Sequence, residues 1–513
     1  MAMLVKLDQA HNWRLRYHLQ VPHGALTDPN GLCQFKGIYH VFHQYEPRWP
    51  RERGHGWGHW SSRDLITWHW HGGAIMPSCQ LDEHGSYSGS SVVRDGRMWC
   101  YYTGNVLMPG GREAGYDYDL AGRKANEILV TSDDGIHFDT GAKRLVLGNE
   151  GYPTYCSNHV RDPKVWWQDG AWHMLLGART LEGRGCVLLH RSDDGLVWEL
   201  EGSATTIGDT PFGYMWECPN MVQLGGREFL LVCPQGIPKR QYRFQCIHNA
   251  GYFPIEGTVI DLMSQDPDLM DAKQPYPCLD GDAFVELDFG FDFYAGQPFV
   301  DEQGRTILIG WAGVADMEFE YDVPTTREWA HTLTMPRELS LNVAGNICQW
   351  PVAEMEQLRT EEVGFKAELA HGSTGFMGSS TYDTFSMEGA IGARFDGIGE
   401  FVIQNIEGTG HVMLNGDLEF VINDNDAELV FHSHAGRYRS VRRLPFSRLS
   451  AGRVESLRVM VDTSVVEIFV NGGEVTMTTR WFPLDIKSLA VTSTLKGEHR
   501  AWALRGFTFE NIA

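Results

Sequence analysis

The sequence lacks the features that mark membrane, secreted and nucleic-acid-binding proteins. No stretch approaches the roughly 18 apolar residues of a membrane-spanning helix, and residues 1–20 contain no apolar core of a secretory signal. Basic residues are scarce, with 43 Lys and Arg against 66 Asp and Glu, which gives a net charge of −23. Such a charge opposes binding to nucleic acids and to anionic membranes. We therefore expect a cytoplasmic protein without nucleic-acid or membrane partners.

Cysteine pairs are also absent: ten cysteines are scattered along the chain, and none forms a CxxC motif. Most occur in short apolar runs, as is typical of buried thiols in a reducing compartment. His55, His59, His69 and His71 have spacings that suit a metal, but no further residue completes a ligand set. The sequence contains no Gly-Lys phosphate loop and no dinucleotide fingerprint. We expect neither a metal site nor a nucleotide cofactor.

Long segments with a helical period are scarce, whereas short apolar and aromatic runs interrupted by glycine recur. Five segments share one form: an apolar strand, a turn with glycine and a second apolar strand. Their turn glycines are Gly37, Gly96, Gly170, Gly226 and Gly304, which lie 56 to 78 residues apart. This spacing fits one four-stranded sheet with its loops per unit, so the repeat predicts an all-β fold with a five-bladed β-propeller.

A second repeat has the same phase as the first. Ser-x-Asp turns begin at positions 62, 132 and 192, after each of the first three hairpins, and an aromatic residue follows six places after each serine. An aspartate at this position can close a turn through its side chain, and the aromatic ring can fill the space between neighbouring sheets. One such turn is common in any protein, but three copies in phase indicate structural repetition.

The hairpin repeat brings acidic residues into register. Eight or nine residues before the turn glycines lie Asp28, Ser88, Asp162 and Glu217, and the fifth unit has Gly296 and Gln297 near this place. The first strands of propeller blades surround one axis, so the three acids are expected to converge there. Convergence of like charges raises at least one carboxyl pKa, as a general acid requires.

A prolyl residue follows each of the three acids within two positions, which keeps the chain extended and opposes a helix. Glycoside hydrolysis needs one carboxylic acid to protonate the leaving oxygen and one carboxylate on the other side of the anomeric carbon. A third carboxylate can bind sugar hydroxyls and stabilise positive charge. Flat aromatic faces that could stack on a sugar are supplied by Trp57, Trp60, Tyr87 and Trp216.

Several segments together resemble glycoside hydrolase family 32, the invertase and sucrose-6-phosphate hydrolase family. In chain order they are TDPNG (27–31), HVFHQYEP (40–47), WGHWSSRDLITW (57–68), YSGS (87–90), RDPKVW (161–166), WECPN (216–220), DFYAGQ (292–297) and WAHTLTMPREL (329–339). The stretch VDTSVVEIFVNGG (461–473) is similar to the accessory β-sandwich of the same family. Each fragment alone is weak, but their common order is specific.

The resemblance implies a role for each acid. Asp28 matches the nucleophile that forms a fructosyl-enzyme, and Glu217 matches the general acid/base. Asp162 matches the residue that binds fructosyl hydroxyls and stabilises the transition state, with Arg161 beside it. Together these roles imply double displacement through a covalent intermediate, with retention of configuration and without a metal or organic cofactor.

The resemblance also assigns the fructose pocket to Gln44, Trp60 and Ser88. Tyr87 is expected to bind the sugar through its aromatic face. The sequence departs from the family pattern directly before the nucleophile, where Ala25-Leu26-Thr27 replaces the usual Trp-Met/Leu-Asn. Thr27 offers a shorter hydroxyl in place of an amide, so we expect the hydrogen bonding of the fructosyl ring to differ there.

The domain organisation predicted from these patterns has three parts. Residues 1–345 form the propeller, and residues 346–360 form a linker with a short helix over 352–359 that has Val352, Met355 and Leu358 on one side. From residue 361 to 513 the chain has alternating strands with Asn-Gly turns, the pattern of a β-sandwich.

The expected partner is a small-molecule sugar, which could be sucrose, sucrose 6-phosphate or a short fructan. Three alternatives to a fructosidase remain open: a fructosyltransferase, a related arabinosidase and a catalytically silent sugar-binding propeller. The acid trio argues against the last two. The loop from Pro47 to Gly56 carries Arg48, Arg51, Arg53 and His55, which are either a phosphate site beside the pocket or an ordinary solvated surface.

Overall fold

The computed structural model describes residues 13–52, 54–108, 122–264, 273–316, 328–367, 389–432, 441–483 and 485–511. Within these ranges strands dominate, and helices are short, as in the five-residue α1 (Val259–Met263). None of the helices in the described ranges is long and apolar enough to cross a membrane. The scarcity of helical periodicity in the sequence therefore corresponds to a mostly β structure.

Five antiparallel sheets follow one another along the first part of the chain, each built from four strands in chain order. The first two sheets consist of β1 (Gly24–Phe35), β2 (Ile38–Glu46), β3 (Gly56–Ser62) and β4 (Thr67–Ile75), then β5 (Ser86–Arg94), β6 (Arg97–Leu107), β7 (Arg123–Ser132) and β8 (Arg144–Leu147). The third consists of β9 (Cys156–Gln168), β10 (Ala171–Thr180), β11 (Gly185–Ser192) and β12 (Glu199–Thr206).

The fourth and fifth sheets are shorter. They consist of β13 (Met215–Leu224), β14 (Arg227–Gln235), β15 (Gly251–Pro254) and β17 (Val285–Glu286), then β18 (Tyr294–Val300), β19 (Thr306–Trp311), β21 (Arg337–Leu341) and β22 (Ile347–Pro351). Two short strands extend the edges of the first and third sheets, β20 (Trp329–Ala330) beside β1 and β16 (Pro277–Leu279) beside β12.

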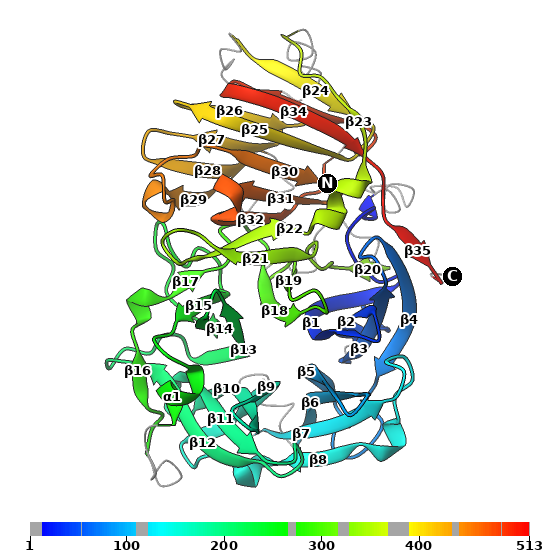
Figure 1. Cartoon of the computed structure of the whole chain (residues 1–513), viewed down its shortest axis with the longest axis vertical. Helices are drawn as coiled ribbons and strands as arrows, with labels where there is room; N and C mark the ends of the chain where they lie inside the picture. The colour runs from blue at the N-terminus through cyan, green and yellow to red at the C-terminus, as the bar shows by residue number, and fades with distance from the viewer. Residues whose placement is uncertain are drawn as a thin grey trace.

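The first strands of the five sheets lie side by side around one centre (Figure 1). Strand β1 contacts β5, β5 contacts β9, β9 contacts β13, β13 contacts β18, and β18 returns to β1. The side chains of these five strands are therefore the ones that can meet at the centre of the ring.

The turns that sequence periodicity predicted are confirmed. All five hairpin glycines have positive φ, between 72° and 82°, the left-handed conformation that glycine adopts without a steric penalty. In the Ser-x-Asp turns, the Asp64 carboxylate accepts hydrogen bonds from the backbone N–H groups of Ile66 and Thr67, and Asp134 and Asp194 do the same in their sheets. The aromatic residues after these turns pack into the cores.

Two six-stranded sheets follow the ring and enclose one apolar core, which the upper part of Figure 1 shows. One has the order β23 (Arg359–Glu362), β34 (Lys496–Leu504), β25 (Gly399–Glu407), β30 (Leu457–Val461), β31 (Val465–Val470) and β32 (Val475–Arg480). The other has the order β24 (Ile391–Phe395), β33 (Leu489–Ser493), β26 (Gly410–Leu414), β27 (Leu418–Ile422), β28 (Asp426–Phe431) and β29 (Val441–Pro445).

The segment between the ring and the two sheets is short and buried. Strand β22 occupies the start of the segment that the sequence indicated as a linker, and the helix there is the 3-10 helix η5 (Ala353–Leu358). Val352, Met355 and Leu358 are fully buried in a core that also contains residues of β1 to β4 and of β31. Near the C-terminus, β35 (Thr508–Glu510) returns to the ring and pairs in parallel with β4.

Candidate active site

The five strands around the centre of the ring, β1, β5, β9, β13 and β18, are called the inner strands. Each of them loses regular pairing at the position that the hairpin repeat indicated. The register shifts lie between Leu26 and Pro29 in β1, between Ser86 and Gly89 in β5, opposite residues 161–164 of β9, between Glu217 and Asn220 in β13, and between Tyr294 and Gln297 in β18. A bulge turns a side chain out of the alternating pattern of a strand. The five equivalent bulges therefore direct side chains toward the centre of the ring.

Three of these bulges hold a non-glycine residue in the left-handed region. Asp162 has φ 66°, Cys218 has φ 47° and Ala295 has φ 50°, conformations that cost free energy and concentrate at functional sites. Close packing accompanies them: a Cβ atom at Gly177, the residue paired with Arg161, would lie 2.2 Å from the carbonyl oxygen of Trp216. Glycine at this position lets β13 approach β10, so that Glu217 reaches Arg161.

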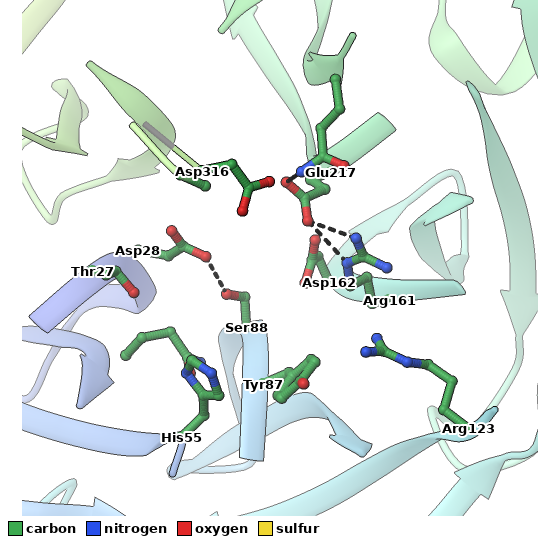
Figure 2. Close-up of a pocket in the computed structure, with 13 residues that line it drawn as sticks. Thr27, Asp28, His55, Tyr87, Ser88, Arg123, Arg161, Asp162, Glu217 and Asp316 are labelled. Carbon is green, nitrogen blue, oxygen red and sulfur yellow. Dashed lines mark hydrogen bonds and ion pairs between the residues drawn. The ribbon is translucent and has the colours of Figure 1, made fainter. Parts of the chain in front are cut away.

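A pocket opens at this end of the ring (Figure 2). Its lining residues are Thr27, Asp28, Gln44, His55, Tyr87, Ser88, Arg123, Arg161, Asp162, Glu217, Gln235, Ala315 and Asp316. Eight of the nine residues that the sequence indicated are among them. The three acids of β1, β9 and β13 thus share one cavity, although 189 residues separate the first from the last.

Asp28 is held by a neutral donor. The Ser88 hydroxyl donates a hydrogen bond of 2.9 Å to its Oδ2, and in the amide orientation that satisfies both groups Asn30 donates to Ser88 Oγ at 3.2 Å. Burial raises the pKa of Asp28 to about 7, and the negative charges of Glu217 and Asp162 add to this rise. Asp28 therefore changes its protonation state near neutral pH.

Asp162 is held mainly by the backbone. The N–H of Cys218 donates to its Oδ2 at 2.9 Å, and its own N–H donates to Thr103 Oγ1 at 3.0 Å. Burial raises the pKa of Asp162 to about 6, an effect that Arg161 opposes and Glu217 increases. The carboxylate is thereby fixed between two neighbouring inner strands.

Glu217 receives donors on both carboxylate oxygens. Arg161 donates to Oε1 from Nη2 at 2.6 Å and from Nε at 3.1 Å. Gln235 Nε2 donates to Oε2 at 2.8 Å, and the Tyr294 hydroxyl donates to the same oxygen at 2.6 Å. Charge-assisted bonds of this kind fix the orientation of a carboxylate.

The three acids lie close enough for their charges to interact. Burial is the main cause of the raised pKa values of Asp28 and Asp162, and the charge of Glu217 adds to both, while Arg161 pairs directly with Glu217. Protons in such a cluster belong to the set of sites rather than to single residues. Near pH 7 the pocket can therefore hold a proton for transfer and still present a carboxylate. Over the described ranges no group of three His, Cys, Asp or Glu side chains is arranged to bind a metal.

The structure corrects the prediction that Trp60 belongs to the sugar-binding pocket. Its side chain is 1% exposed and packs against Trp70 and Phe509 in a core, outside the pocket lining. Strand β3 carries it, and β2 separates β3 from the inner strand. Trp57 and Trp216 are also fully buried, so of the four expected stacking faces only Tyr87 lines the pocket.

The residues of the arginine-rich loop (47–56) lie in different environments. Arg48 is 73% exposed and pairs with Glu52 at 2.9 Å, and neither it nor the exposed Arg51 lines the pocket. Arg53 lies outside the described residues. Among the described residues of this loop, His55 alone lines the cavity, where its ring lies 5.2 Å from that of Tyr87.

Sequence reasoning missed Arg123, Gln235 and Asp316 of the lining and Tyr294 behind Glu217. The hairpin repeat could have indicated Tyr294, because this residue lies at the bulge of the fifth inner strand, at the place where other inner strands carry an acid. The other three come from second or third strands or from a loop after β19, positions for which the repeat provides no register.

Comparison with known proteins identifies the family. The glycosyl hydrolases family 32 N-terminal domain matches residues 18–351, and the family 32 C-terminal domain matches residues 419–501. Sucrose-6-phosphate hydrolase of Bacillus subtilis (strain 168) is 33% identical over 483 residues, covering 92% of this chain and 89% of the relative. Raffinose invertase of Escherichia coli is 32% identical over 486 residues, covering 93% and 90%.

Solved structures agree with the sequence relatives. A family 32 β-fructofuranosidase from Bombyx mori, determined as a mutant with sucrose, has a TM-score of 0.74 at 26% identity, with 98% of this chain and 97% of that chain covered. Sucrose-6-phosphate hydrolase from Lactobacillus gasseri has the same score and identity, with 98% and 95% covered. This chain belongs to glycosyl hydrolase family 32 and is a glycoside hydrolase of the invertase type.

Proposed function

We propose that this chain is a retaining β-fructofuranosidase that hydrolyses the fructosyl bond of sucrose or sucrose 6-phosphate, and of short fructo-oligosaccharides. The observation that carries the proposal is the meeting of Asp28, Asp162 and Glu217 in one pocket, each held by different donors. Relatives named sucrose-6-phosphate hydrolase support the substrate class. The cytoplasmic location expected from the sequence belongs to the same proposal.

The reaction divides into two displacements. An Asp28 carboxylate oxygen attacks the anomeric carbon of the fructosyl unit, while Glu217 gives its proton to the leaving glycosidic oxygen. The C–O bond to the leaving sugar breaks as the bond to Asp28 forms. Glu217, now ionised, then takes a proton from water, and the resulting hydroxyl oxygen displaces Asp28 to release fructose. Two inversions at one carbon give net retention.

The neighbouring groups suit these steps. Ser88 donates one hydrogen bond to Asp28 and thus orients it without a full compensating charge. Arg161, Gln235 and Tyr294 stabilise Glu217 in the ionised form that proton transfer produces. Asp162, fixed by the Cys218 N–H, is in a place to accept hydrogen bonds from fructosyl hydroxyls and to stabilise the positive charge that develops on the ring.

The fold proposal follows the same residues. We interpret the five sheets as blades of a five-bladed β-propeller, because their first strands contact one another in a closed order. The domain boundaries that we propose are a propeller over 1–345, a linker over 346–360 and a β-sandwich over 361–513, with β22 continuing the last blade into the linker.

Stereochemistry provides the test of the mechanism. Hydrolysis of sucrose in dilute methanol should give methyl β-fructofuranoside as the trapped product, since retention transfers fructose to methanol on the same face. The product is identified by NMR. Methyl α-fructofuranoside would indicate inversion and refute the covalent role of Asp28, and no turnover of any fructoside would refute the function. A larger yield of oligosaccharides than of fructose would favour the fructosyltransferase alternative.

Phosphate recognition is a second part of the proposal. The Arg123 guanidinium lies 5.6 Å from the centre of the Tyr87 ring, and the His55 ring approaches the same ring edge to face. In Figure 2, Tyr87 lies between His55 and Arg123, away from Asp28 and Asp316. Both groups are of types that bind phosphate, and Arg can do so with two parallel hydrogen bonds.

Steady-state kinetics on sucrose, sucrose 6-phosphate and 1-kestose test this part. Arg123→Ala should raise KM for sucrose 6-phosphate about tenfold or more and change KM for sucrose little. Arg48→Ala, in an exposed pair outside the pocket, is the matched control and should change neither. Equal effects of Arg123→Ala on both sugars would exclude a phosphate role.

A further inference from the structure

Tyr294 reaches Glu217 from β18, an inner strand that supplies no acid to the pocket. Its hydroxyl oxygen lies 2.6 Å from Glu217 Oε2 and 3.3 Å from the carbonyl oxygen of Cys233. The side chain is 1% exposed and does not line the pocket, so it contacts Glu217 from behind. The hydroxyl thus has two acceptors within reach and one proton to give.

The donors around Glu217 present a chemical problem. A general acid must carry a proton before the first step, and a protonated carboxyl needs an acceptor for its O–H. Arg161 has no acceptor atom, and Gln235 presents its amide nitrogen, a donor, to the carboxylate. Of the groups that bond to Glu217 in the described ranges, only the Tyr294 hydroxyl can both donate and accept through a single atom. Gln235 would have to turn its amide by about 180° to present its oxygen.

We propose that Tyr294 is a positioning residue that holds Glu217 in both of its protonation states by reversing the direction of one hydrogen bond. This inference rests on the proposed function, in which Glu217 is the acid/base. When Glu217 is protonated, its O–H donates to the Tyr294 oxygen, and the phenolic proton turns to the Cys233 carbonyl. After the proton has moved to the leaving oxygen, the phenol turns back and donates to the carboxylate.

The exchange requires no net proton transfer to tyrosine and no movement of heavy atoms. Burial and the charge of Glu217 raise the pKa of Tyr294 well above its usual value, so the phenol keeps its proton throughout. The bond to the ionised carboxylate is charge-assisted and therefore stronger than the bond to the neutral acid. Tyr294 thus favours proton release from Glu217 and stabilises the charge that forms as the leaving group departs.

Other charged and titratable groups also act on this pair. They are Arg161 and Asp162 on β9, Asp28 on β1, Cys218 on β13, Cys233 on β14, and His248, whose ring centre lies 6.2 Å from that of Tyr294 and which pairs with Asp316. None of them reaches Glu217 with a hydroxyl, so replacing Tyr294 by Phe removes the reversible bond and leaves these groups in place.

The experiment compares Tyr294→Phe with the wild type in the pH dependence of kcat/KM and with two donors. Loss of the phenol should move the alkaline limb of the kcat/KM profile to higher pH by about half a unit or more, because ionised Glu217 loses a hydrogen-bond donor. Hydrolysis of sucrose should slow by about 10- to 100-fold, whereas fructosyl fluoride, whose leaving group needs little protonation, should react at nearly the wild-type rate.

Tyr102→Phe is the matched control, because Tyr102 is also buried and donates to a buried carboxylate, Asp82, at 2.7 Å. It should leave the alkaline limb unchanged. Incorporation of 3-fluorotyrosine at position 294 keeps the hydroxyl and makes it a stronger donor, so the limb should move to lower pH even if Tyr294→Phe does not fold. An unshifted limb in the fluorinated enzyme, or equal losses on both donors in Tyr294→Phe, would overturn the inference. Inactive wild-type enzyme would instead refute the proposed function.

Discussion

Two buried polar regions of this molecule use the same kinds of side chain with opposite results. In the pocket, Asp28 and Asp162 receive hydrogen bonds from a hydroxyl and a backbone N–H, and their pKa values are raised. Where the fifth sheet meets the β-sandwich, Glu467 accepts hydrogen bonds from Arg337 and contacts the ring of His18, and the pKa of Glu467 is lowered. Both regions are buried, so burial alone does not decide the shift.

The second region is a chain of alternating charges. Arg337 donates to Glu467 Oε2 from Nη2 at 2.6 Å and from Nε at 2.9 Å. His18 lies between Glu467 at 2.9 Å and Asp462 at 2.8 Å, and these two carboxylates raise its pKa to about 9 against the opposing effect of burial. Every acid there has a cation in contact, so each buried charge is paired.

The comparison shows which arrangement of charges supports proton transfer and which one stabilises the fold. Cations in direct contact with each acid leave no proton to transfer, and they join two parts of the fold. Acids in excess of cations keep protons that can be transferred, at a cost to stability. The following predictions test this difference, beginning with the largest effect.

Asp28→Asn should reduce kcat on sucrose by about 10⁴-fold or more, because the amide cannot form the fructosyl-enzyme. Rates are measured by fructose release at saturating sucrose. Ser91→Ala, which removes only a hydroxyl that donates to the Gly31 carbonyl on the same two strands, is the control and should keep most of the activity. A less than tenfold loss in Asp28→Asn would contradict the nucleophile assignment.

Arg337→Met should lower the free energy of unfolding by about 3–5 kcal/mol, because it leaves Glu467 and Asp288 buried without their guanidinium. Chemical denaturation measures the loss, and kcat of the folded fraction should stay close to that of the wild type. Arg500→Met, in an exposed pair with Glu362, is the control and should leave the transition nearly unchanged. If both variants unfolded alike, the paired network would not carry the stability assigned to it.

His18 should make the protein sensitive to alkali. Its pKa is raised in the folded state, so its contribution to stability is fully present below about pH 6.5 and is lost as the pH rises through about 9. The change is on the order of 3 kcal/mol. Unfolding free energies measured from pH 6 to 10 should fall in the wild type and fall less in His18→Gln. Parallel curves for the two proteins would show that His18 does not carry a charge.

Asp28→Asn should also stabilise the protein slightly at alkaline pH. The pKa of Asp28 is raised in the folded state, so ionisation lowers stability as the pH rises from about 4 through 7. The amide avoids this cost, and we expect a gain of about 1–2 kcal/mol at pH 8.5 and about a third of that at pH 5, where the cost has only begun to develop. Calorimetry at the two pH values measures it. Equal changes at both would mean that packing rather than charge is responsible.

Much of the site was accessible from the sequence because it is repeated. The hairpin glycines fix the phase of each inner strand, and the acids occupy the same place in that phase. The same reasoning does not reach Gln235 or Arg123, which arrive on β14 and β7, since only the first strand of each sheet lines the axis along its length.

The failure with Trp60 has a different cause. A sequence segment that matches a family motif carries core and pocket residues together, and motif membership does not separate them. Trp60 on β3 pairs with Val41 of β2 and Trp70 of β4, and its ring packs against Trp70 and Phe509 in the core. The distinction between packing and binding depends on the order of strands in the sheet, which alternation of residues alone does not give.

Strand β35 has a consequence for how the chain could be shortened. It comes from the far end of the sequence and covers the outer edge of β4, with Thr508, Phe509 and Glu510 in parallel register with Thr67, Trp68 and His69. A protein ending before residue 508 would expose the backbone groups of β4 as an unprotected edge, a template for pairing with other molecules. Removal of the last strand is therefore expected to produce aggregates before it produces a smaller soluble enzyme.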